Sequence, residues 1–269
     1  MSLFQILLLA VLQGIAEFLP ISSKGHLVLL EAILEKFNGV EISEPLELNI
    51  LLHAGTLASI LVFYWREVWQ LLTSDRRVIG LLVVGTLPVV LIGLPVHEID
   101  ALRDLVAQPL LVGCMLPITG LLLIAGGRRP SGTTDYTQMS YPQALLIGLF
   151  QAFAILPGIS RSGTTIVGGM VAGLKRESTA TFSFLLAIPA ILGALVLELR
   201  KVLKSGSSYE MGPLLLGAVV SFLVGLVALY WLNRWLARGR LQWFAYWCIP
   251  VGLAVAVWQV AALYSAAPG

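Results

Sequence analysis

Residues 12–27 read LQGIAEFLPISSKGHL, and this stretch decides the fold because it breaks the apolar region 1–35 in its middle. A helix needs about 20 apolar residues to cross a bilayer, so neither arm of the region crosses comfortably by itself. Pro20 and Gly25 are residues that stop a helix. The pattern therefore predicts a re-entrant helical hairpin, which is two short helices joined by a turn at membrane depth.

A second apolar region, 143–173, is broken in the same way, and residues 156–165 read LPGISRSGTT. Three crossings separate the two predicted hairpins, so the halves that contain them are inverted relative to one another, an arrangement known in membrane proteins with broken helices. Chance matching among Leu, Gly and Ala is the alternative, but a shared Gln and a shared Ile-Ser-x-x-Gly pattern favour a duplication. Five identical pairs lie 138 positions apart: Gln13 and Gln151, Ala16 and Ala154, Ile21 and Ile159, Ser22 and Ser160, and Gly25 and Gly163.

The composition of the 269-residue chain is that of a polytopic membrane protein, since 58% of residues are hydrophobic and 12% are charged. Soluble domains carry about 25% charged residues. The deficit excludes an ordinary soluble enzyme, a disordered chain and a nucleic-acid-binding protein, and the net charge of +2 indicates no particular partner. We predict a single all-α integral membrane domain over 1–269, with six transmembrane helices, two re-entrant hairpins and inverted repeats at about 1–97 and 143–233. The six continuous apolar runs are 48–64, 79–97, 110–126, 180–197, 213–233 and 243–264.

Lys and Arg residues predict the orientation, because loops on the cytoplasmic side are rich in them. Basic residues gather in the loops 65–78, 127–142, 174–179 and 234–240, which we place inside. Both termini then lie outside. The loop 199–211 disagrees, since it carries Arg200, Lys201 and Lys204 and falls outside.

Polar residues of the first hairpin supply reactive groups. An ionisable group in a span costs about 2.5–3.5 kcal/mol, so Glu17 needs a functional or structural reason to be there. Gln13 and Glu17 lie four residues apart and share a helix face. Ser22, Ser23 and His26 add two hydroxyls and an imidazole just after the break.

The second hairpin predicts an anion site. A glycine-rich turn that opens a helix presents backbone N–H groups, and Arg161 adds a guanidinium suited to phosphate oxygens. Lys24 of the first hairpin would be a further cation for pyrophosphate. The candidate phosphate-binding residues of the second hairpin are Gly158, Ser160, Arg161, Ser162, Gly163, Thr164 and Thr165.

These motifs resemble those of the bacterial undecaprenyl pyrophosphate phosphatases, the bacitracin-resistance family. Residues 12–27 resemble its (E/Q)xxxE plus SSxGH signature, residues 156–165 its PGxSRSxxT motif, and residues 182–189 (FSFLLAIP) its FSFLLxxP segment. The likeness extends over essentially the whole chain. Two departures are Gln13, where some members have Glu, and Lys24, where Ser or Thr is usual.

The resemblance implies hydrolysis of undecaprenyl pyrophosphate to undecaprenyl phosphate, which recycles the lipid carrier for wall synthesis and gives bacitracin resistance, since bacitracin competes for that lipid. It implies a multi-pass protein of the bacterial cytoplasmic membrane, surrounded by lipid, with an active site open to the outer side. A divalent cation, Mg²⁺ or Ca²⁺, is expected, with Glu17 and Gln13 as ligands. A homodimer is left open, and no nucleic acid is expected.

The roles that we predict place Arg161 as the clamp on the pyrophosphate, with Ser23 as the nucleophile and Ser22 as the second choice. Either His26 or Glu17 acts as the base, and direct attack by a water activated by Glu17 stays open. We interpret His53 as structural.

A secondary transporter or flippase of a phosphorylated prenyl lipid is the competing class, because inverted repeats and broken helices also occur in transporters. A type-2 phosphatidic acid phosphatase is less well matched, since its Ser-Arg-x5-His motif requires His where this chain has Val167. A purely structural scaffold would not need the polar cluster.

Overall fold

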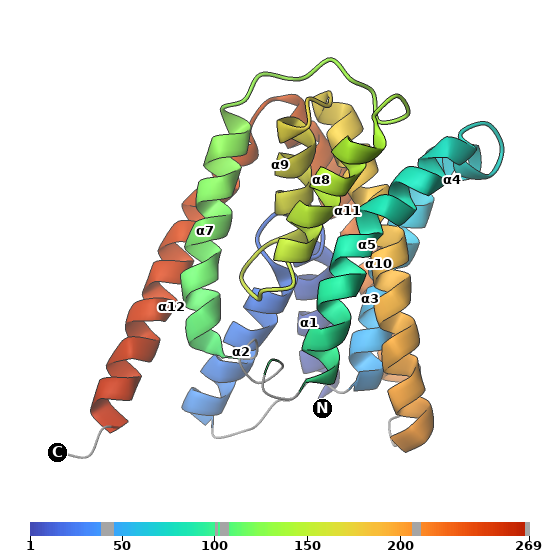
Figure 1. Cartoon of the computed structure of the whole chain (residues 1–269). Coiled ribbons are helices and arrows are strands. Elements are labelled where there is room, and N and C mark those ends of the chain that lie inside the picture. Colours follow the sequence, from blue (N-terminus) through green and yellow to red (C-terminus); the bar gives the residue numbers. More distant parts are fainter. Residues whose placement is uncertain (39–45, 100–101, 103–107, 206–210, 267–269) are drawn as a thin grey trace.

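The computed structural model describes residues 1–38, 46–99, 102, 108–205 and 211–266. This part of the chain is helical, and the sole β-pairing within it is an isolated bridge between Thr134 and Leu174. The predicted all-α class is therefore confirmed (Figure 1).

Six helices of the described ranges are long and apolar enough to cross a membrane, as predicted. Four of the predicted apolar runs lie within one of them; 48–64 passes the end of its helix by one residue, and 243–264 begins in the turn that precedes its helix. The helices also extend into the polar flanks of the runs. Pro88 and Pro189 lie inside two of these helices and do not end them. Neighbouring helices and local adjustments tolerate such residues in spans. The six helices are α3 (Leu46–Phe63), α5 (Arg76–Glu98), α7 (Pro109–Gly127), α10 (Arg176–Ser205), α11 (Met211–Ala237) and α12 (Ala245–Ala266), the last preceded by the 3₁₀ turn η1 (Leu241–Phe244).

The segment 65–78, which we expected to be a loop, contains the short helix α4 (Trp65–Leu72). Its apolar residues explain the difference, because Trp65, Trp69 and Leu72 recur at helical spacing on an exposed face while Leu71 is buried. Figure 1 shows α4 projecting from the upper end of the molecule.

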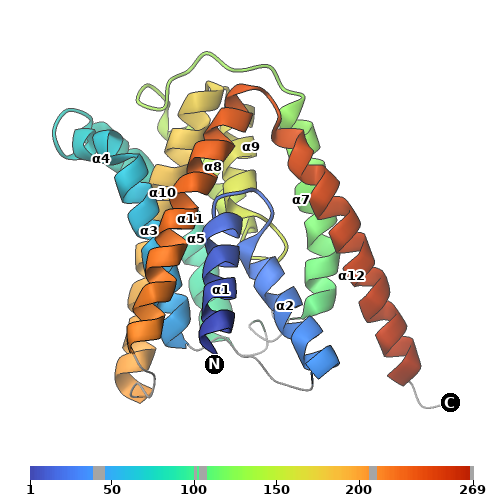
Figure 2. The same cartoon turned by 180° about the vertical axis from the view of Figure 1, so that it is seen from behind.

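Two pairs of shorter helices account for the broken apolar regions. The first pair is α1 (Leu3–Ala16) and α2 (Ser23–Asn38), and the second is α8 (Tyr141–Phe153) and α9 (Arg161–Val171). Figures 1 and 2 show the outer ends of the first pair at the lower end of the molecule and those of the second pair at the upper end. The turns of both pairs lie near mid-height.

Packing fixes each pair against long helices. The helix α1 lies against α11 and α3, α8 lies against α5, and α7 packs along α12. The first turn is anchored by Phe18, which is fully buried and meets the ring of Phe184 edge to face at 5.7 Å between centroids. Burial of an aromatic ring is among the larger apolar contributions of a core, so this contact holds the first turn next to α10.

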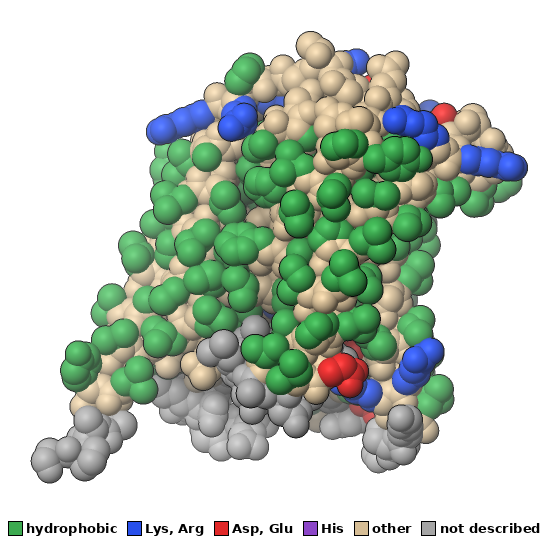
Figure 3. Space-filling view, viewed as in Figure 1, with side chains coloured by type: hydrophobic (Ala, Val, Ile, Leu, Met, Phe, Trp, Pro, Cys, Tyr) green, Lys and Arg blue, Asp and Glu red, His purple; other side chains and the backbone are tan. Residues whose placement is uncertain are grey.

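The basic segments lie together at one end of the molecule. Arg77 donates to the carbonyls of Thr137 and Met139, and Arg176 donates to the carbonyl of Arg129 at 3.0 Å. Figure 3 shows most of the visible Lys and Arg side chains at the upper end, above a hydrophobic surface. This grouping agrees with the predicted basic side, and Arg200, near the opposite end of the 30-residue α10, is the predicted exception.

Candidate active site

The turns of the two short helix pairs touch, which the sequence could not show. The Ser22 hydroxyl accepts hydrogen bonds from the backbone N–H groups of Gly25, at 3.3 Å, and of Gly158, at 3.1 Å. A Cβ atom on Gly25 would lie 3.1 Å from the Gly158 backbone, which is closer than most Cβ contacts, so this approach favours glycine. Gly158 also has φ of 94°, which glycine adopts without strain, whereas Ser22 holds φ of 72° as a non-glycine residue. The Ser22 hydroxyl thus links the two turns by hydrogen bonds.

Thr119 on α7 fixes the second turn from the other side. Its hydroxyl donates to the Gly158 carbonyl at 2.7 Å and accepts from the Ser160 N–H at 3.1 Å. These bonds satisfy backbone groups that a non-helical turn would otherwise leave unpaired inside a membrane protein. Sequence reasoning missed Thr119, because a single Thr in an apolar helix carries no signal of its partner.

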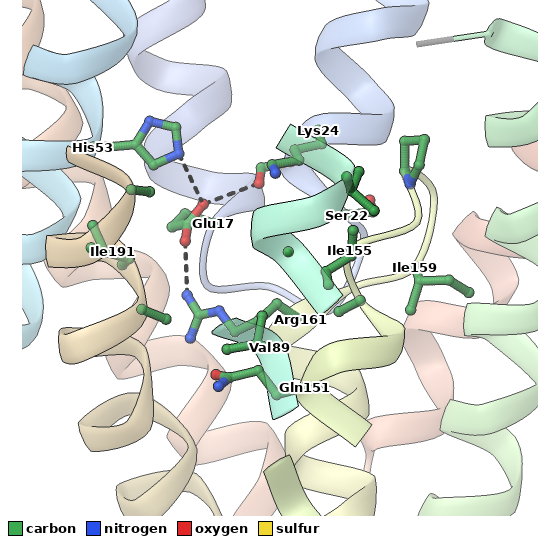
Figure 4. Close-up of a pocket in the computed structure, with 18 of the residues that line it drawn as sticks. Glu17, Ser22, Lys24, His53, Val89, Gln151, Ile155, Ile159, Arg161 and Ile191 are labelled. Carbon is green, nitrogen blue, oxygen red and sulfur yellow. Dashed lines mark hydrogen bonds and ion pairs between the residues drawn. The ribbon is translucent and has the colours of Figure 1, made fainter. Parts of the chain in front are cut away.

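Glu17 is the centre of the polar cluster. Its Oε1 accepts a hydrogen bond from Arg161 Nη2 at 2.8 Å, and its Oε2 accepts from Ser23 Oγ at 3.0 Å and from Gln13 Nε2 at 3.1 Å. The Glu17 side chain is 9% exposed. The structure thereby brings Glu17 of the first turn together with Arg161 of the second turn (Figure 4). Ser23 joins them through its bond to Glu17.

A cavity of about 770 Å³ opens beside this cluster. Its polar lining includes Glu17, Ser23, Lys24 and Arg161, while α5 and α10 contribute mainly aliphatic side chains. The Nη1 atom of Arg161 is buried and has no hydrogen-bond partner among the described residues. A guanidinium nitrogen in that state is suited to an oxyanion that enters the cavity.

His53 on α3 also lines the cavity, although we interpreted it as structural. Its Nε2 lies 4.0 Å from Glu17 Oε2 (Figure 4). Its Nδ1 lies 3.0 Å from the Asn49 carbonyl oxygen. A bond to a backbone carbonyl fixes which nitrogen carries the proton and orients the ring. The sequence neighbours of His53, Gly55 and Thr56, do not show whether its side chain faces the cavity or the protein core.

His26 lies on another side of the first turn and is not among the residues that line the cavity. Its Nδ1 lies 2.8 Å from the Ser22 carbonyl oxygen, and its Nε2 accepts from the indole N–H of Trp247 at 2.9 Å. Both ring nitrogens are therefore engaged by groups that hold the turn and α12 in place.

Several predicted phosphate-binding groups are also used inside the fold. Ser160 accepts from the Gly163 N–H at 3.2 Å, as the N-cap of α9. Thr164 and Thr165 donate to backbone carbonyls of the same helix, at 2.8 Å each, as Ser and Thr often do in membrane helices. Gly158, Ser162, Gly163, Thr164 and Thr165 do not line the cavity, whereas Ser160, Arg161, Ser22, Ser23 and Lys24 do.

The expected pair of metal ligands does not form a site by itself. Gln13 directs its amide nitrogen to Glu17, and both Glu17 oxygens already accept hydrogen bonds. Within the described ranges no three His, Cys, Asp or Glu residues lie close enough to hold an ion. The residues present therefore do not fit a metal held by protein groups alone.

Comparison with known proteins gives a match over nearly the whole chain. The family model described as "Bacitracin resistance protein BacA" matches residues 6–254. An undecaprenyl-diphosphatase of Rhodopirellula baltica is 55% identical over 256 residues, which are 94% of this chain and 97% of the relative. Proteins of the same name from Desulfatibacillum aliphaticivorans and Carboxydothermus hydrogenoformans are 39% and 37% identical, over 96% and 97% of this chain and 99% of each relative.

Proposed function

Because the chain belongs to the bacitracin resistance protein BacA family, we propose that it is a membrane phosphatase that hydrolyses undecaprenyl pyrophosphate to undecaprenyl phosphate and inorganic phosphate. One observation carries this function: the Ser23 hydroxyl donates to a carboxylate, Glu17, that is itself paired with Arg161 at the edge of a cavity. A hydroxyl, a base and an oxyanion clamp are the groups that phosphoryl transfer requires.

Substrate binding uses the cationic side of the cavity. Arg161 Nη1 has no partner among the described residues, and Lys24 lines the same cavity. The helices α2 and α9 begin at Ser23 and Arg161, so the positive ends of both helix dipoles lie near the same point. A pyrophosphate at this point draws Arg161 toward its oxygens and frees Glu17 from the ion pair.

The chemical step follows from the contact between Ser23 and Glu17. Glu17 takes the hydroxyl proton as Ser23 Oγ attacks the terminal phosphorus, and the bond from that phosphorus to the bridging oxygen breaks, which releases undecaprenyl phosphate. Water then hydrolyses the phosphoserine and releases inorganic phosphate. Arg161 stabilises charge on the equatorial oxygens in both steps.

His53 is placed to support the base. At 4.0 Å from Glu17 Oε2, its ring orients the carboxylate on the side away from Arg161. We assign it a positioning role in the same reaction. Direct attack by water activated by Glu17 is the alternative route, and it requires no phosphoserine.

We further propose that the two short helix pairs are re-entrant hairpins of an inverted repeat. Two observations support this: the turns of the pairs lie near mid-height with their outer ends at opposite ends of the molecule, and α1 packs on α11 as α8 packs on α5 (Figures 1 and 2). The exchange of partners between the first and second halves is the pattern that inverted halves produce.

The basic end of the molecule supports an orientation with that end in the cytoplasm and the cavity open to the outer side of the bacterial cytoplasmic membrane. In that position the enzyme would recycle the carrier lipid for wall synthesis and compete with bacitracin for the pyrophosphate form. A requirement for Mg²⁺ or Ca²⁺ stays a prediction, in which the ion enters with the pyrophosphate; phosphate release with and without EDTA measures it. The homodimer also stays a prediction, which light scattering of the solubilised protein would test.

The deciding experiment measures phosphate release from undecaprenyl pyrophosphate by the purified protein in detergent. Detergent micelles do not separate two compartments, so transport cannot occur. We expect turnover and a phosphoserine at Ser23 when the reaction is quenched in acid. Ser23→Ala should lose both. Turnover that survives in Ser23→Ala without a phosphoenzyme would favour direct attack by water, and no phosphate release by the wild-type protein would favour the flippase.

A further inference from the structure

Gln151 on α8 is a buried polar residue to which the proposed reaction assigns no role. It is 1% exposed and lines the same cavity as Arg161. Its Nε2 donates to the Gly85 carbonyl at 3.5 Å, which is longer than most protein hydrogen bonds. Its Oε1 is buried and has no hydrogen-bond partner in the part of the chain that the structure describes. Because an unpaired buried amide oxygen destabilises a fold, Gln151 requires an explanation.

The equivalent residue of the first helix pair shows what Gln151 lacks. Gln13, which lies 138 positions earlier, donates from its amide to Glu17, four residues later, at 3.1 Å. The residue four positions after Gln151 is Ile155, whose side chain has no acceptor. Among the described residues, the Gln151 side chain is therefore held only by the long bond to Gly85.

Arg161 supplies the complementary group. Its Nη2 donates to Glu17 at 2.8 Å, whereas its Nη1 is buried and has no partner in the described ranges. Figure 4 shows the Arg161 side chain between those of Glu17 and Gln151. Because Nη1 carries two N–H groups, it can donate to Gln151 Oε1 and to a phosphate oxygen at the same time. An unpaired donor and an unpaired acceptor thus line one cavity.

Of these two side chains, Arg161 is the one that can move. The helix α8 is held against α5 one turn before Gln151, because a Cβ on Gly148 would collide with the Gly85 carbonyl. Arg161 instead has a long side chain at the first position of α9, and its guanidinium bonds only to Glu17 within the described structure. A pyrophosphate that draws the guanidinium away from Glu17 therefore leaves it free to turn toward Gln151.

We propose that Gln151 is a positioning residue for Arg161: when pyrophosphate enters the cavity, Arg161 Nη1 donates to Gln151 Oε1, and this bond fixes the guanidinium in the orientation that binds the phosphate oxygens. The inference rests on the proposed phosphatase function, but it holds whether Ser23 or water attacks the phosphorus. A neutral amide suits this role, because it accepts from a guanidinium without competing with pyrophosphate for its charge, as a carboxylate would.

The test is a double-mutant cycle between positions 151 and 161. Gln151→Met keeps the size of the side chain but removes the amide, so kcat/KM for undecaprenyl pyrophosphate should fall by about 10-fold. In an Arg161→Lys background the same change should alter kcat/KM by less than about 2-fold, because an ammonium has no second nitrogen for Gln151 to hold.

Thermal unfolding and a matched variant separate this role from a structural one. The thermal midpoint of Gln151→Met should not fall, because the substitution removes an unpaired buried oxygen and only one long hydrogen bond. The control is Gln242→Met in η1, which should leave kcat/KM unchanged. Gln242 Oε1 is likewise buried without a partner among the described residues, but Gln242 does not line the cavity.

A second measurement follows binding without activity. Calorimetric titration of the purified protein in detergent with inorganic pyrophosphate should give a dissociation constant about 5-fold larger for Gln151→Met than for the wild type, and no such difference in the Arg161→Lys background. Equal losses in both backgrounds, no loss in either, or a loss that accompanies a lower thermal midpoint would overturn the positioning role. If the wild-type protein binds pyrophosphate but releases no phosphate from undecaprenyl pyrophosphate, the proposed function fails, and the binding cycle still decides the role of Gln151.

Discussion

The turn after α1 and the turn after α8 share one hydrogen bond but differ in chemistry and in backbone, since φ is 72° at Ser22 and −79° at Ser160. In each, a serine hydroxyl accepts the N–H of a glycine three residues later: Ser22 from Gly25 and Ser160 from Gly163, at 3.3 and 3.2 Å. These are equivalent positions of the 138-residue offset. This bond is local, since the side chain of a Ser N-cap accepts from an N–H of the first helical turn.

The positions around that hydrogen bond have diverged. Ser23 follows the first serine, and Arg161 follows the second; Glu17 precedes the first by five residues, and Ile155 is its counterpart. In the proposed mechanism, one turn therefore supplies the nucleophile and its base, and the other supplies the oxyanion clamp. The two turns keep the bond from serine to glycine, while the residues that surround it differ.

The largest expected effect comes from removing the group that distinguishes each turn. Glu17→Gln keeps the size and a bond to Ser23 but removes the base, and Arg161→Ala removes the clamp. We expect each to lower kcat for undecaprenyl pyrophosphate by about 10³-fold, within the range known for general bases and oxyanion donors. Phosphate release measures it. Glu177→Gln, an exposed carboxylate on α10, is the control; activity within about 10-fold of wild type in either variant would contradict the division of roles.

The contact between the turns gives the next largest effect. Gly25→Ala places a Cβ 3.1 Å from the Gly158 backbone, so the turns must shift apart slightly. We expect a loss of about 1–3 kcal/mol in stability and about 10-fold in activity, from overpacking. Gly212→Ala, in open space on α11, should be neutral or stabilising, because alanine favours a helix by about 1 kcal/mol over glycine. An equally stable and active Gly25→Ala would show that the turns need not touch.

The two histidines next to the first turn sharpen the comparison further. His53→Ala removes the ring beside Glu17 and should lower kcat by about 10-fold and alter the pH profile of kcat. His26→Ala instead frees the Ser22 carbonyl and Trp247, so it should lower stability and activity together. Trp247→Phe should reproduce part of the loss in His26→Ala. The rate of phosphate release measured against pH distinguishes a role beside the base from a role in holding the turn. A pH profile altered by His26→Ala alone would assign the base to His26.

Sequence patterns predicted the spans because their cause is local. An apolar run of sufficient length must be helical in lipid, and the two broken runs stop where Pro20 and Gly158 stand among polar residues. Pro88 and Pro189, which stand among apolar residues, do not end their helices. The amphipathic α4 was missed because its eight residues are too short to cross, and because Arg66, Arg76 and Arg77 led us to interpret 65–78 as a basic loop.

The sequence predicted which residue types form the candidate site but not the directions in which their side chains point. Glu17, Ser23 and Arg161 were selected because charged and hydroxyl side chains at a break in an apolar run require a functional or structural role. The sequence could not show that His26 turns toward α12 while His53 reaches the cavity, because both depend on how distant helices pack. Thr164 and Thr165 donate to backbone carbonyls, as hydroxyls on helices readily do, and their predicted binding of phosphate stays a prediction.

The smallest predicted effect is on stability and concerns Asp135, in the loop between α7 and α8 outside the membrane. Burial alone would raise the pKa of the Asp135 carboxyl, but hydrogen bonds from Thr137 and Ser178 and the charge of Lys175 hold its pKa below the usual 3.8. A carboxyl with a lowered pKa stabilises the fold above its unfolded pKa, and this contribution is lost as the pH falls through the folded pKa. Asp135→Asn should therefore lower stability at pH 7 by about 1 kcal/mol or less, as for exposed charges, and by less at pH 3. Thermal unfolding at the two pH values measures the difference, and the same loss at both would show that the charge of Asp135 contributes nothing.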